Sequence, residues 1–295
     1  MKKITILVNG KEKTYARPSC EIEGFEVVSC TCEDNNMNLY NYIDSENKLL
    51  STNEEFEEAN AFKGGFGVVQ RTNGRYNYIK PDGTLLSSED FEAAWDFEGG
   101  LAVVKRINRL FNYIKPDGTI LSPNEDFQEA FYFVGGFGRV ERTDGFGNYI
   151  KPDGTILSPN EDFQDVFDFE GGFGLVLREG GLYNYIKPDG TFLSSEDFGE
   201  ACFFNEGFGL VRRENELWNY IKPDGTILSP NEDFDNAFVF SEGFGRVERE
   251  DGLYNYIKPD GSFLSSENFY NAEDFQEGVG TILIQHKIDK DGNII

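Results

Sequence analysis

The sequence predicts an all-β protein built from tandem repeats, and three observations support this prediction. The dipeptide Asn-Tyr returns seven times at intervals of 35 or 36 residues in a chain of 295 residues. Each copy lies in a short run rich in aromatic and branched residues, which is typical of a strand. Pro-Asp-Gly or a related tripeptide follows each copy and indicates a tight turn. A fixed period of this length is the signature of repeat architectures.

The repeats fill almost the whole chain. We expect one tandem-repeat domain over residues 1–295, with an amino-terminal capping segment at 1–20 and eight β-hairpin repeats at 21–295, the last one shortened. The period varies by one residue because some units read Ser-Pro-Asn-Glu-Asp-Phe, as at 122–127, and others read Ser-Ser-Glu-Asp-Phe, as at 87–91. The change in length therefore falls in a loop.

The unit at residues 241–275 shows the expected elements in order. Residues 246–249 and 253–258 predict a first and a middle strand joined by a turn. Pro259-Asp260-Gly261 predicts a three-residue hairpin loop, since proline presets one turn angle and glycine accepts a positive φ. A third short strand is expected at 262–264. The first unit has Asn47 in place of this glycine, and asparagine is the best substitute in the left-handed region.

Each unit continues with Phe-x-x-Ala/Val-x-x-Phe, for example Phe234, Ala237 and Phe240. This spacing allows either a turn of helix or a fourth, irregular strand. The last aromatic position recurs in every unit and predicts that neighbouring units stack and share one core. The members of this aromatic column are Phe62, Phe97, Phe133, Phe169, Phe204, Phe240 and Phe275.

Two architectures accommodate eight such units. We prefer an open β-solenoid or superhelix, because nothing in the sequence forces the array to close. The alternative is an eight-bladed, β-propeller-like ring, for which about 36 residues per blade is compact. The apolar first segment and the divergent last unit fit caps on an open stack or strands that meet across a ring.

The repeated pattern resembles the WG-repeat family of bacterial tandem-repeat proteins over about nine-tenths of the chain. The resemblance rests on Phe-x-x-Ala-x-x-Phe, then Gly-Phe-Gly-x-Val, and then an aromatic residue before Tyr-Ile. Asparagine replaces the glycine of the family's Trp-Gly pair in every unit, and only Trp218 keeps the tryptophan. The resemblance implies a β-repeat fold used for interactions, with no general enzymatic activity.

Charge limits the classes of partner. The chain has 27 Lys and Arg against 53 Asp and Glu, a net charge of −26. Direct binding of nucleic acid or of an anionic membrane surface needs the opposite sign. The apolar run at residues 4–8 is too short for a secretory signal, and no run reaches the length of a membrane span. We expect a cytoplasmic protein.

The sequence offers little for catalysis or for cofactors, and we expect neither an enzyme nor a bound cofactor or metal. His286 is the only histidine, which argues against histidine-based catalysis. Cys20, Cys30 and Cys32 could supply thiolates to zinc, but a fourth ligand is missing. The Lys-Pro-Asp-Gly-Thr turns lack the alternating acids of a calcium loop. A catalytic site is also normally made once, whereas these acids repeat.

Two polar columns recur with the repeats. The asparagine of each Asn-Tyr pair lies among apolar neighbours, so we expect it to bond between units or to satisfy loop backbone, with a ligand groove as the alternative. Arginines end the first strands, and we expect inter-unit ion pairs with the acidic loops, with a ligand-binding row as the alternative. The arginines are Arg71, Arg106, Arg142, Arg178, Arg213 and Arg249.

The leading functional hypothesis is a non-catalytic scaffold that binds a protein with a basic patch through an acidic surface. An acidic decoy for a nucleic-acid-binding protein is a special case. The candidate acids are Glu125, Asp126, Glu161, Asp162, Glu232 and Asp233. The alternative is a glycan-binding module with Tyr183, Tyr185 and Trp218 as stacking platforms. The first hypothesis predicts binding that salt weakens, and the second predicts exposed aromatic rings.

Overall fold

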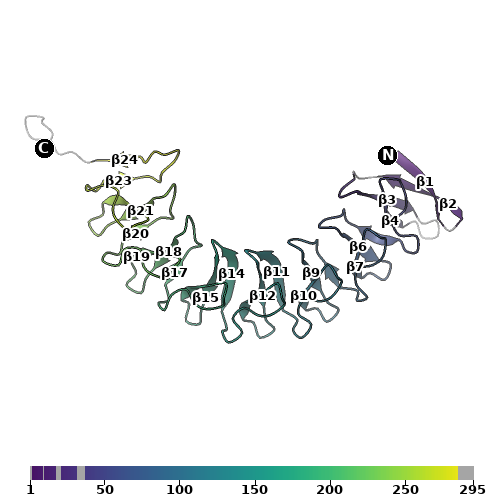
Figure 1. Ribbon diagram of the computed structural model, residues 1–295, viewed down its shortest axis with the longest axis horizontal. Coiled ribbons are helices and arrows are strands. Elements are labelled where there is room, and N and C mark those ends of the chain that lie inside the picture. Colours follow the sequence, from purple (N-terminus) through teal and green to yellow (C-terminus); the bar gives the residue numbers. More distant parts are fainter. Residues whose placement is uncertain (1, 9, 18–20, 32–36, 285–295) are drawn as a thin grey trace, which may run out of the picture. The chain divides into compact units, whose positions relative to one another are not determined.

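The computed structural model describes residues 2–8, 10–17, 21–31 and 37–284. Within these ranges all regular elements are strands, so the all-β prediction is confirmed (Figure 1). The chain divides into two compact units. Unit 1 comprises Met1–Phe133, Gly138–Gly145 and Ile150–Thr155, and unit 2 comprises Val134–Phe137, Phe146–Tyr149 and Ile156–Ile295. The single domain and the choice between open stack and ring stay predictions.

Unit 1 contains antiparallel strands in chain order. The first seven form one sheet, and the next three form a second sheet in the order β10-β9-β8. The strands are β1 (Lys2–Val8), β2 (Lys11–Arg17), β3 (Phe25–Thr31), β4 (Asn38–Asp44), β5 (Phe56–Ala59), β6 (Gly67–Arg71), β7 (Tyr76–Ile79), β8 (Ala93–Ala94), β9 (Ala102–Lys105) and β10 (Phe111–Ile114). Three strands contain boundaries between the units: β11 (Glu129–Val134), β12 (Phe137–Glu141) and β13 (Gly147–Ile150).

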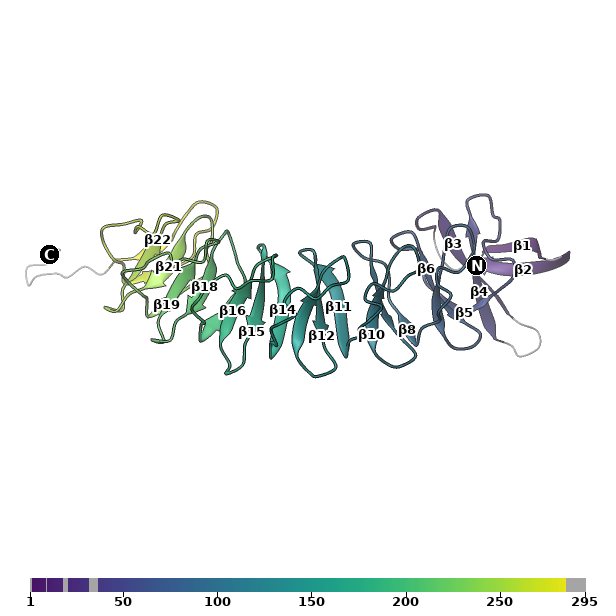
Figure 2. The ribbon, with the colours of Figure 1, turned by 60° about the horizontal axis from the view of Figure 1, so that its bottom comes forward.

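Unit 2 repeats one small sheet. Three three-stranded sheets, each in chain order, are followed by a two-stranded sheet (Figure 2). The strands are β14 (Asp165–Glu170), β15 (Phe173–Leu177), β16 (Tyr183–Ile186), β17 (Glu200–Ala201), β18 (Gly209–Arg212), β19 (Trp218–Ile221), β20 (Asn236–Ala237), β21 (Gly245–Glu248), β22 (Tyr254–Ile257), β23 (Asn271–Ala272) and β24 (Ile282–Leu283). The expected end of the eighth repeat, residues 285–295, lies outside the described residues.

The predicted first and middle strands are present, the structure decides between the two alternatives for the Phe-x-x-Ala segment, and the predicted third strand needs correction. The Phe-x-x-Ala segment is a short strand: Glu200 and Ala201 pair with Arg212 and Val211 of the hairpin that follows. It is thus the first strand of the next sheet. The predicted third strand at 262–264 is wrong, because only one isolated bridge joins Phe263 to Ile257.

The Pro-Asp-Gly turn has the predicted geometry. Gly261 N donates to Lys258 O at 2.9 Å, Lys258 N donates to Ser262 O at 2.8 Å, and Gly261 has φ +82°. Asn47 takes the same left-handed conformation with φ +62°, as predicted. Later repeats need glycine for a second reason. A Cβ on Gly225 would lie 2.2 Å from Leu193 O of the preceding repeat.

Both faces of the sheet β17-β18-β19 in unit 2 are buried, because a sheet packs on each side of it. Val211 and Ile221 of sheet β17-β18-β19 pack with Leu175 of the preceding sheet. On its other face Leu210 and Tyr220 pack with the following sheet. The middle strand therefore has three consecutive buried residues instead of the alternation expected from a half-buried strand.

The aromatic column connects neighbouring sheets within a unit. Phe240 stacks on Phe208 at 4.1 Å and meets Tyr220 edge-on at 5.0 Å between ring centroids. The Tyr220 hydroxyl donates to Phe238 O at 2.6 Å, so the buried ring also satisfies its polar end. The predicted sharing of one core between neighbouring repeats is confirmed by these contacts.

Candidate binding surface

The buried asparagines fasten the acidic loops to the middle strands. Asn219 Nδ2 donates to Ser229 O at 2.8 Å and to Glu232 O at 3.1 Å. Its Oδ1 accepts from Tyr220 N at 2.8 Å and from Ser229 N at 3.2 Å. All seven are at most 1% exposed: Asn41, Asn77, Asn112, Asn148, Asn184, Asn219 and Asn255. The expectation that they satisfy loop backbone is confirmed, and their amides do not line a ligand groove.

Arginines at the ends of the first strands bridge successive acidic loops. Arg213 Nε lies 2.9 Å from Glu196 of the preceding loop, and its Nη1 lies 2.9 Å from Asp233 of the following one. Arg106 makes the same two contacts, at 2.9 Å each, with Glu89 and Asp126. The predicted ion pairs between neighbouring repeats are therefore present in both unit 1 and unit 2.

The second acid of each loop is the better fixed of the two. Asp233 accepts from Asn219 at 2.7 Å and from Asn215 at 2.8 Å in addition to Arg213. Burial alone would raise the pKa of Asp233, but these hydrogen bonds and the arginine charge bring it below the ordinary value of 3.8. The pKa of Asp126 is lowered in the same way, by Asn112, Asn108 and Arg106. Both carboxylates are held in the charged form.

This bonding changes the interpretation of the six candidate acids. The side chains of Asp126 and Asp233 are only 12% and 11% exposed, so they belong to the scaffold and offer little to a partner. Glu232 pairs with Arg249 at 2.6 Å, and Glu125 lies 3.4 Å from Arg142. The remaining two candidates are Glu161 and Asp162, in the equivalent loop of the repeat that follows the one with Glu125. Glu161 is half-buried and Asp162 is exposed.

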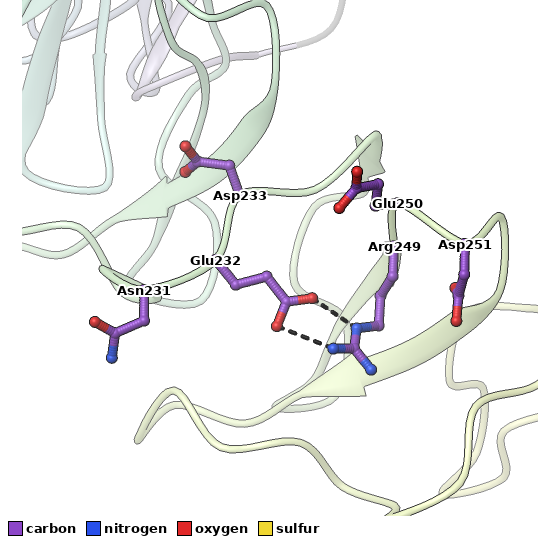
Figure 3. A pocket seen from close by; sticks show the side chains of 6 residues that line it. All are labelled: Asn231, Glu232, Asp233, Arg249, Glu250 and Asp251. Carbon is purple, nitrogen blue, oxygen red and sulfur yellow. Dashed lines mark hydrogen bonds and ion pairs between the residues drawn. The ribbon is translucent and has the colours of Figure 1, made fainter.

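One open pocket in unit 2 brings paired and unpaired acids together (Figure 3). Its volume is 590 Å³, and its lining residues are Asn231, Glu232, Asp233, Arg249, Glu250 and Asp251. Both oxygens of Glu232 meet Arg249, at 2.6 and 3.1 Å, as the dashed lines in Figure 3 show. The only cation of the pocket is thus engaged. Glu250 and Asp251 are exposed and have no ion pair among the described residues.

Sequence reasoning missed Glu250 and Asp251. They lie in the turn between the first and middle strands, where other repeats carry Thr-Asn, Ile-Asn, Thr-Asp, Glu-Gly or Glu-Asn. Asp251 Oδ1 accepts from Leu253 N at 3.0 Å, a turn bond that Asn108 and Asn215 make in other repeats. Its Oδ2 accepts from Asn268 Nδ2 at 3.5 Å. The signal was therefore present, because the charge at these two turn positions differs between repeats.

The three aromatic candidates are unequal. Tyr185 is 1% exposed, and its hydroxyl donates to Cys202 O at 2.6 Å, so it cannot offer a stacking face. Trp218 is half-buried against the core around Phe240, and Tyr183 is half-buried beside Phe167. More exposed rings lie elsewhere: Trp95 is 37% and Tyr132 is 38% exposed in unit 1, and Tyr270 is 55% exposed in unit 2.

Cys30 belongs to a buried cluster at the amino-terminal end of unit 1. Glu55 accepts from the Tyr15 hydroxyl at 2.8 Å and from Cys30 Sγ at 3.4 Å, and it pairs with Lys13. Burial and this carboxylate raise the pKa of the Cys30 thiol to about 11, which keeps it protonated and unreactive. Cys20, Cys32 and His286 lie outside the described residues.

The matches among solved structures are of low similarity. BamB from Moraxella catarrhalis is 10% identical with a TM-score of 0.29, and the match covers 93% of each chain. The WD40 β-propeller domain of Doa1 is 12% identical with a TM-score of 0.27, over 86% of this chain and 89% of that one. No match was found among curated proteins.

One family model matches part of the chain. Residues 218–254 match the model described as WG containing repeat. The resemblance to the WG-repeat family is confirmed. The match begins at Trp218, the one position where the tryptophan is kept, and runs through the acidic loop that contains Asp233 and through β21 to Tyr254, the first residue of β22. No helix in the described part of the chain is long and apolar enough to cross a membrane.

Proposed function

We propose that this WG-repeat protein is a non-catalytic scaffold that binds a protein partner with a basic patch through its acidic surface. The pocket of unit 2 carries the proposal. Its one cation, Arg249, is neutralised by Glu232. Glu250 beside it is exposed and has no ion pair among the described residues, and Asp251, whose two oxygens accept from Leu253 N and Asn268 Nδ2, adds a second negative charge. A lysine or arginine of a partner fits this chemistry, because charge-assisted hydrogen bonds to carboxylates are among the strongest polar contacts.

Repetition of the unit supports the same proposal. The turns between first and middle strands in unit 2 also carry exposed Glu179, Glu214 and Glu216. Several weak contacts presented on one chain act at high effective concentration and produce avidity. Contacts of this kind are screened by salt, so the interaction is expected to weaken steeply as ionic strength rises.

The test uses fluorescence anisotropy with a labelled oligolysine peptide as the basic probe. Binding is expected at about 0.02 M NaCl and largely lost at about 0.5 M. The variant Glu250→Thr/Asp251→Asn keeps the turn, since threonine and asparagine occupy these positions in another repeat. It is expected to bind the probe several-fold more weakly.

A matched control separates the pocket from general attraction. Glu12→Gln/Glu21→Gln removes the same charge from exposed positions of unit 1. If both double variants lose affinity equally, the pocket does not contribute more to binding than other acids of the surface. If the native chain binds no oligolysine at low salt, the acidic-surface proposal is wrong.

A glycan-binding function is the second candidate, and the exposed rings of unit 1 favour it. Trp95 lies 5.8 Å from Phe111 between ring centroids and presents 37% of its surface. Binding through such rings would be insensitive to salt and would be lost in Trp95→Ala. The test is a glycan array probed at two salt concentrations with the native protein and with the Trp95→Ala variant. If neither protein binds any glycan, this candidate function is wrong.

A further inference from the structure

A two-residue turn with two left-handed residues opens the hairpin of every repeat. In each turn both residues have positive φ, for example +62° and +87° at Gly99 and Gly100. Consecutive residues in this conformation point their N–H groups to the same side, which makes a concave anion-binding nest. The described turns are Glu23-Gly24, Gly64-Gly65, Gly99-Gly100, Gly135-Gly136, Gly171-Gly172, Glu206-Gly207, Glu242-Gly243 and Glu277-Gly278.

Three of these nests hold a carboxylate from the preceding repeat. Glu206 Oε1 and Oε2 accept from Glu242 N at 3.0 Å and Gly243 N at 2.8 Å. Glu242 in turn accepts from Glu277 N at 2.8 Å and Gly278 N at 2.7 Å. Glu23 does the same for Gly64 N at 3.1 Å and Gly65 N at 2.9 Å. The molecule itself thus shows which chemical group the nest fits.

Four nests of the central repeats have no such carboxylate. The preceding turn has glycine at the position of Glu206, so no side chain is there to reach across. These open nests are Gly99-Gly100, Gly135-Gly136, Gly171-Gly172 and Glu206-Gly207. All eight residues are exposed, and no acceptor for their N–H groups is found among the described residues. A Cβ on Gly100, Gly136 or Gly172 would meet nothing within 4 Å.

We infer that the four open nests are binding sites for carboxylate groups of a protein partner's Asp or Glu side chains. Each carboxylate would accept one N–H bond on each oxygen, as Glu206 does at Glu242 and Gly243. The inference is independent of the proposed basic partner. It assigns acidic contacts to the hairpin tips and basic contacts to the acidic loops.

The nest at Gly99-Gly100 has further support from its surroundings. It lines a pocket of 430 Å³ in unit 1 together with Leu101, Lys115, Pro116, Asp117 and Pro152. The Asp117 carboxylate is occupied, since its Oδ1 accepts from Thr119 N at 2.9 Å and Thr119 Oγ1 at 2.6 Å. Lys115 adds a positive charge to the lining of the same pocket. The overall negative charge opposes anions, but at 0.15 M salt it is screened beyond about 8 Å.

Backbone NMR tests the inference with acetate as the probe. Sodium acetate is titrated against sodium chloride at equal ionic strength, and ¹H–¹⁵N shifts are followed. We expect saturable shifts at the amides of Gly100, Gly136, Gly172 and Gly207. We expect no saturable shift at Gly65, Gly243 or Gly278, whose N–H groups are already bonded to a carboxylate.

The variant Glu206→Gly converts an occupied nest into an open one. Glycine is the residue of the central repeats at this position, so the turn is expected to keep its conformation. The amide of Gly243 should then join the acetate-responsive set, while Gly252, a turn glycine outside the nests, should not respond. Equal responses in acetate and chloride would overturn the inference, as would a Gly243 amide that stays silent in the variant.

Discussion

At the scale of single residues, the buried asparagine is the most informative position. The resemblance to the WG-repeat family predicts a glycine at this position, and a glycine could make none of the side-chain bonds of the asparagine. Asn219 provides five: three from Nδ2 and two to Oδ1. Burial of the Asn219 side-chain amide costs free energy, and this cost is offset because both of its polar atoms have hydrogen-bond partners. The Ser-Pro-Asn-Glu-Asp loop is therefore fixed from below by Asn219 and from the side by Arg213.

Asn219→Ala is expected to lower the free energy of unfolding by at least about 2 kcal/mol, because buried groups of the loop lose their partners. Asn215→Ala is the matched control. Asn215 binds the same Asp233, at 2.8 Å, but from the exposed side of the loop. Its loss should cost about 1 kcal/mol or less. The denaturant midpoints of the two variants measure these losses. Equal losses of unfolding free energy would show that the buried amide of Asn219 does not hold the loop more firmly than the exposed Asn215 does.

The buried tyrosines should respond to pH in a defined direction. Burial raises the pKa of Tyr42, Tyr78, Tyr113, Tyr185 and Tyr220 well above the ordinary value of 10.0. Since the folded pKa is the higher one, these groups stabilise the fold below pH 10 and lose that contribution as pH rises further. Near-ultraviolet titration of native protein should show their ionisation only together with unfolding, whereas protein unfolded in guanidinium should ionise them near pH 10.

At the scale of the element, the Pro-Asp-Gly turn combines two separate demands on glycine. One is the left-handed φ, which asparagine also tolerates. The other is the approach of the turn to a leucine carbonyl of the preceding repeat, 2.2 Å from a Cβ on Gly225. The first repeat has no preceding repeat of this kind. This difference explains why Asn47 occurs there and nowhere else among these turns.

Gly225→Asn should therefore destabilise the protein by about 1–3 kcal/mol through overpacking, although its φ of +83° suits asparagine. Gly252→Asn controls for the conformation. Its φ is +73°, and a Cβ there would meet nothing within 4 Å, so a change below about 0.5 kcal/mol is expected. Thermal unfolding of both variants decides between the two demands. Similar losses would mean that φ alone requires the glycine.

The sequence predicted the local elements better than their pairing partners. Periodicity and turn residues located the first and middle strands and the Pro-Asp-Gly loop, because these depend on nearby residues. The Phe-x-x-Ala segment could not be assigned, since its strand form depends on bonds to the next hairpin, such as Ala201 with Val211. The strand expected at 262–264 is absent because strand formation also depends on pairing with another segment. Only one of its residues has a bridge partner, Ile257.

The candidate site was harder to predict than the fold. Composition indicated an acidic surface, and the repeated acids were the natural choice for it. Their repetition, however, reflects a structural function: Asp126 and Asp233 hold arginines and asparagines in the same way in different repeats. In the pocket of unit 2, the carboxylates without an ion pair among the described residues are those of Glu250 and Asp251, at positions where the repeats differ. In a tandem array, positions that vary between repeats were the better guide to surface available for binding.

At the scale of the whole molecule, salt weakens two electrostatic effects that have opposite consequences for stability. The ion pairs between arginines and acidic loops weaken as salt rises, and each half-exposed pair contributes about 0–1 kcal/mol. Self-repulsion of a chain with net charge −26 also weakens, which favours the folded state. Each of the six arginines at the ends of the first strands is tied to a carboxylate by a short-range hydrogen bond, which salt screens less than the longer-range repulsion between the acids.

Raising NaCl from about 0.01 M to about 0.15 M should therefore increase the unfolding temperature, because repulsion is the larger of the two screened terms. Differential scanning calorimetry measures the change. Arg213→Gln serves as an internal comparison: it removes one cation of the column, raises the net negative charge and should steepen the gain in stability with salt. A fall in unfolding temperature over this range would mean that the ion pairs of the loops, and not the excess charge, dominate the electrostatics of the fold.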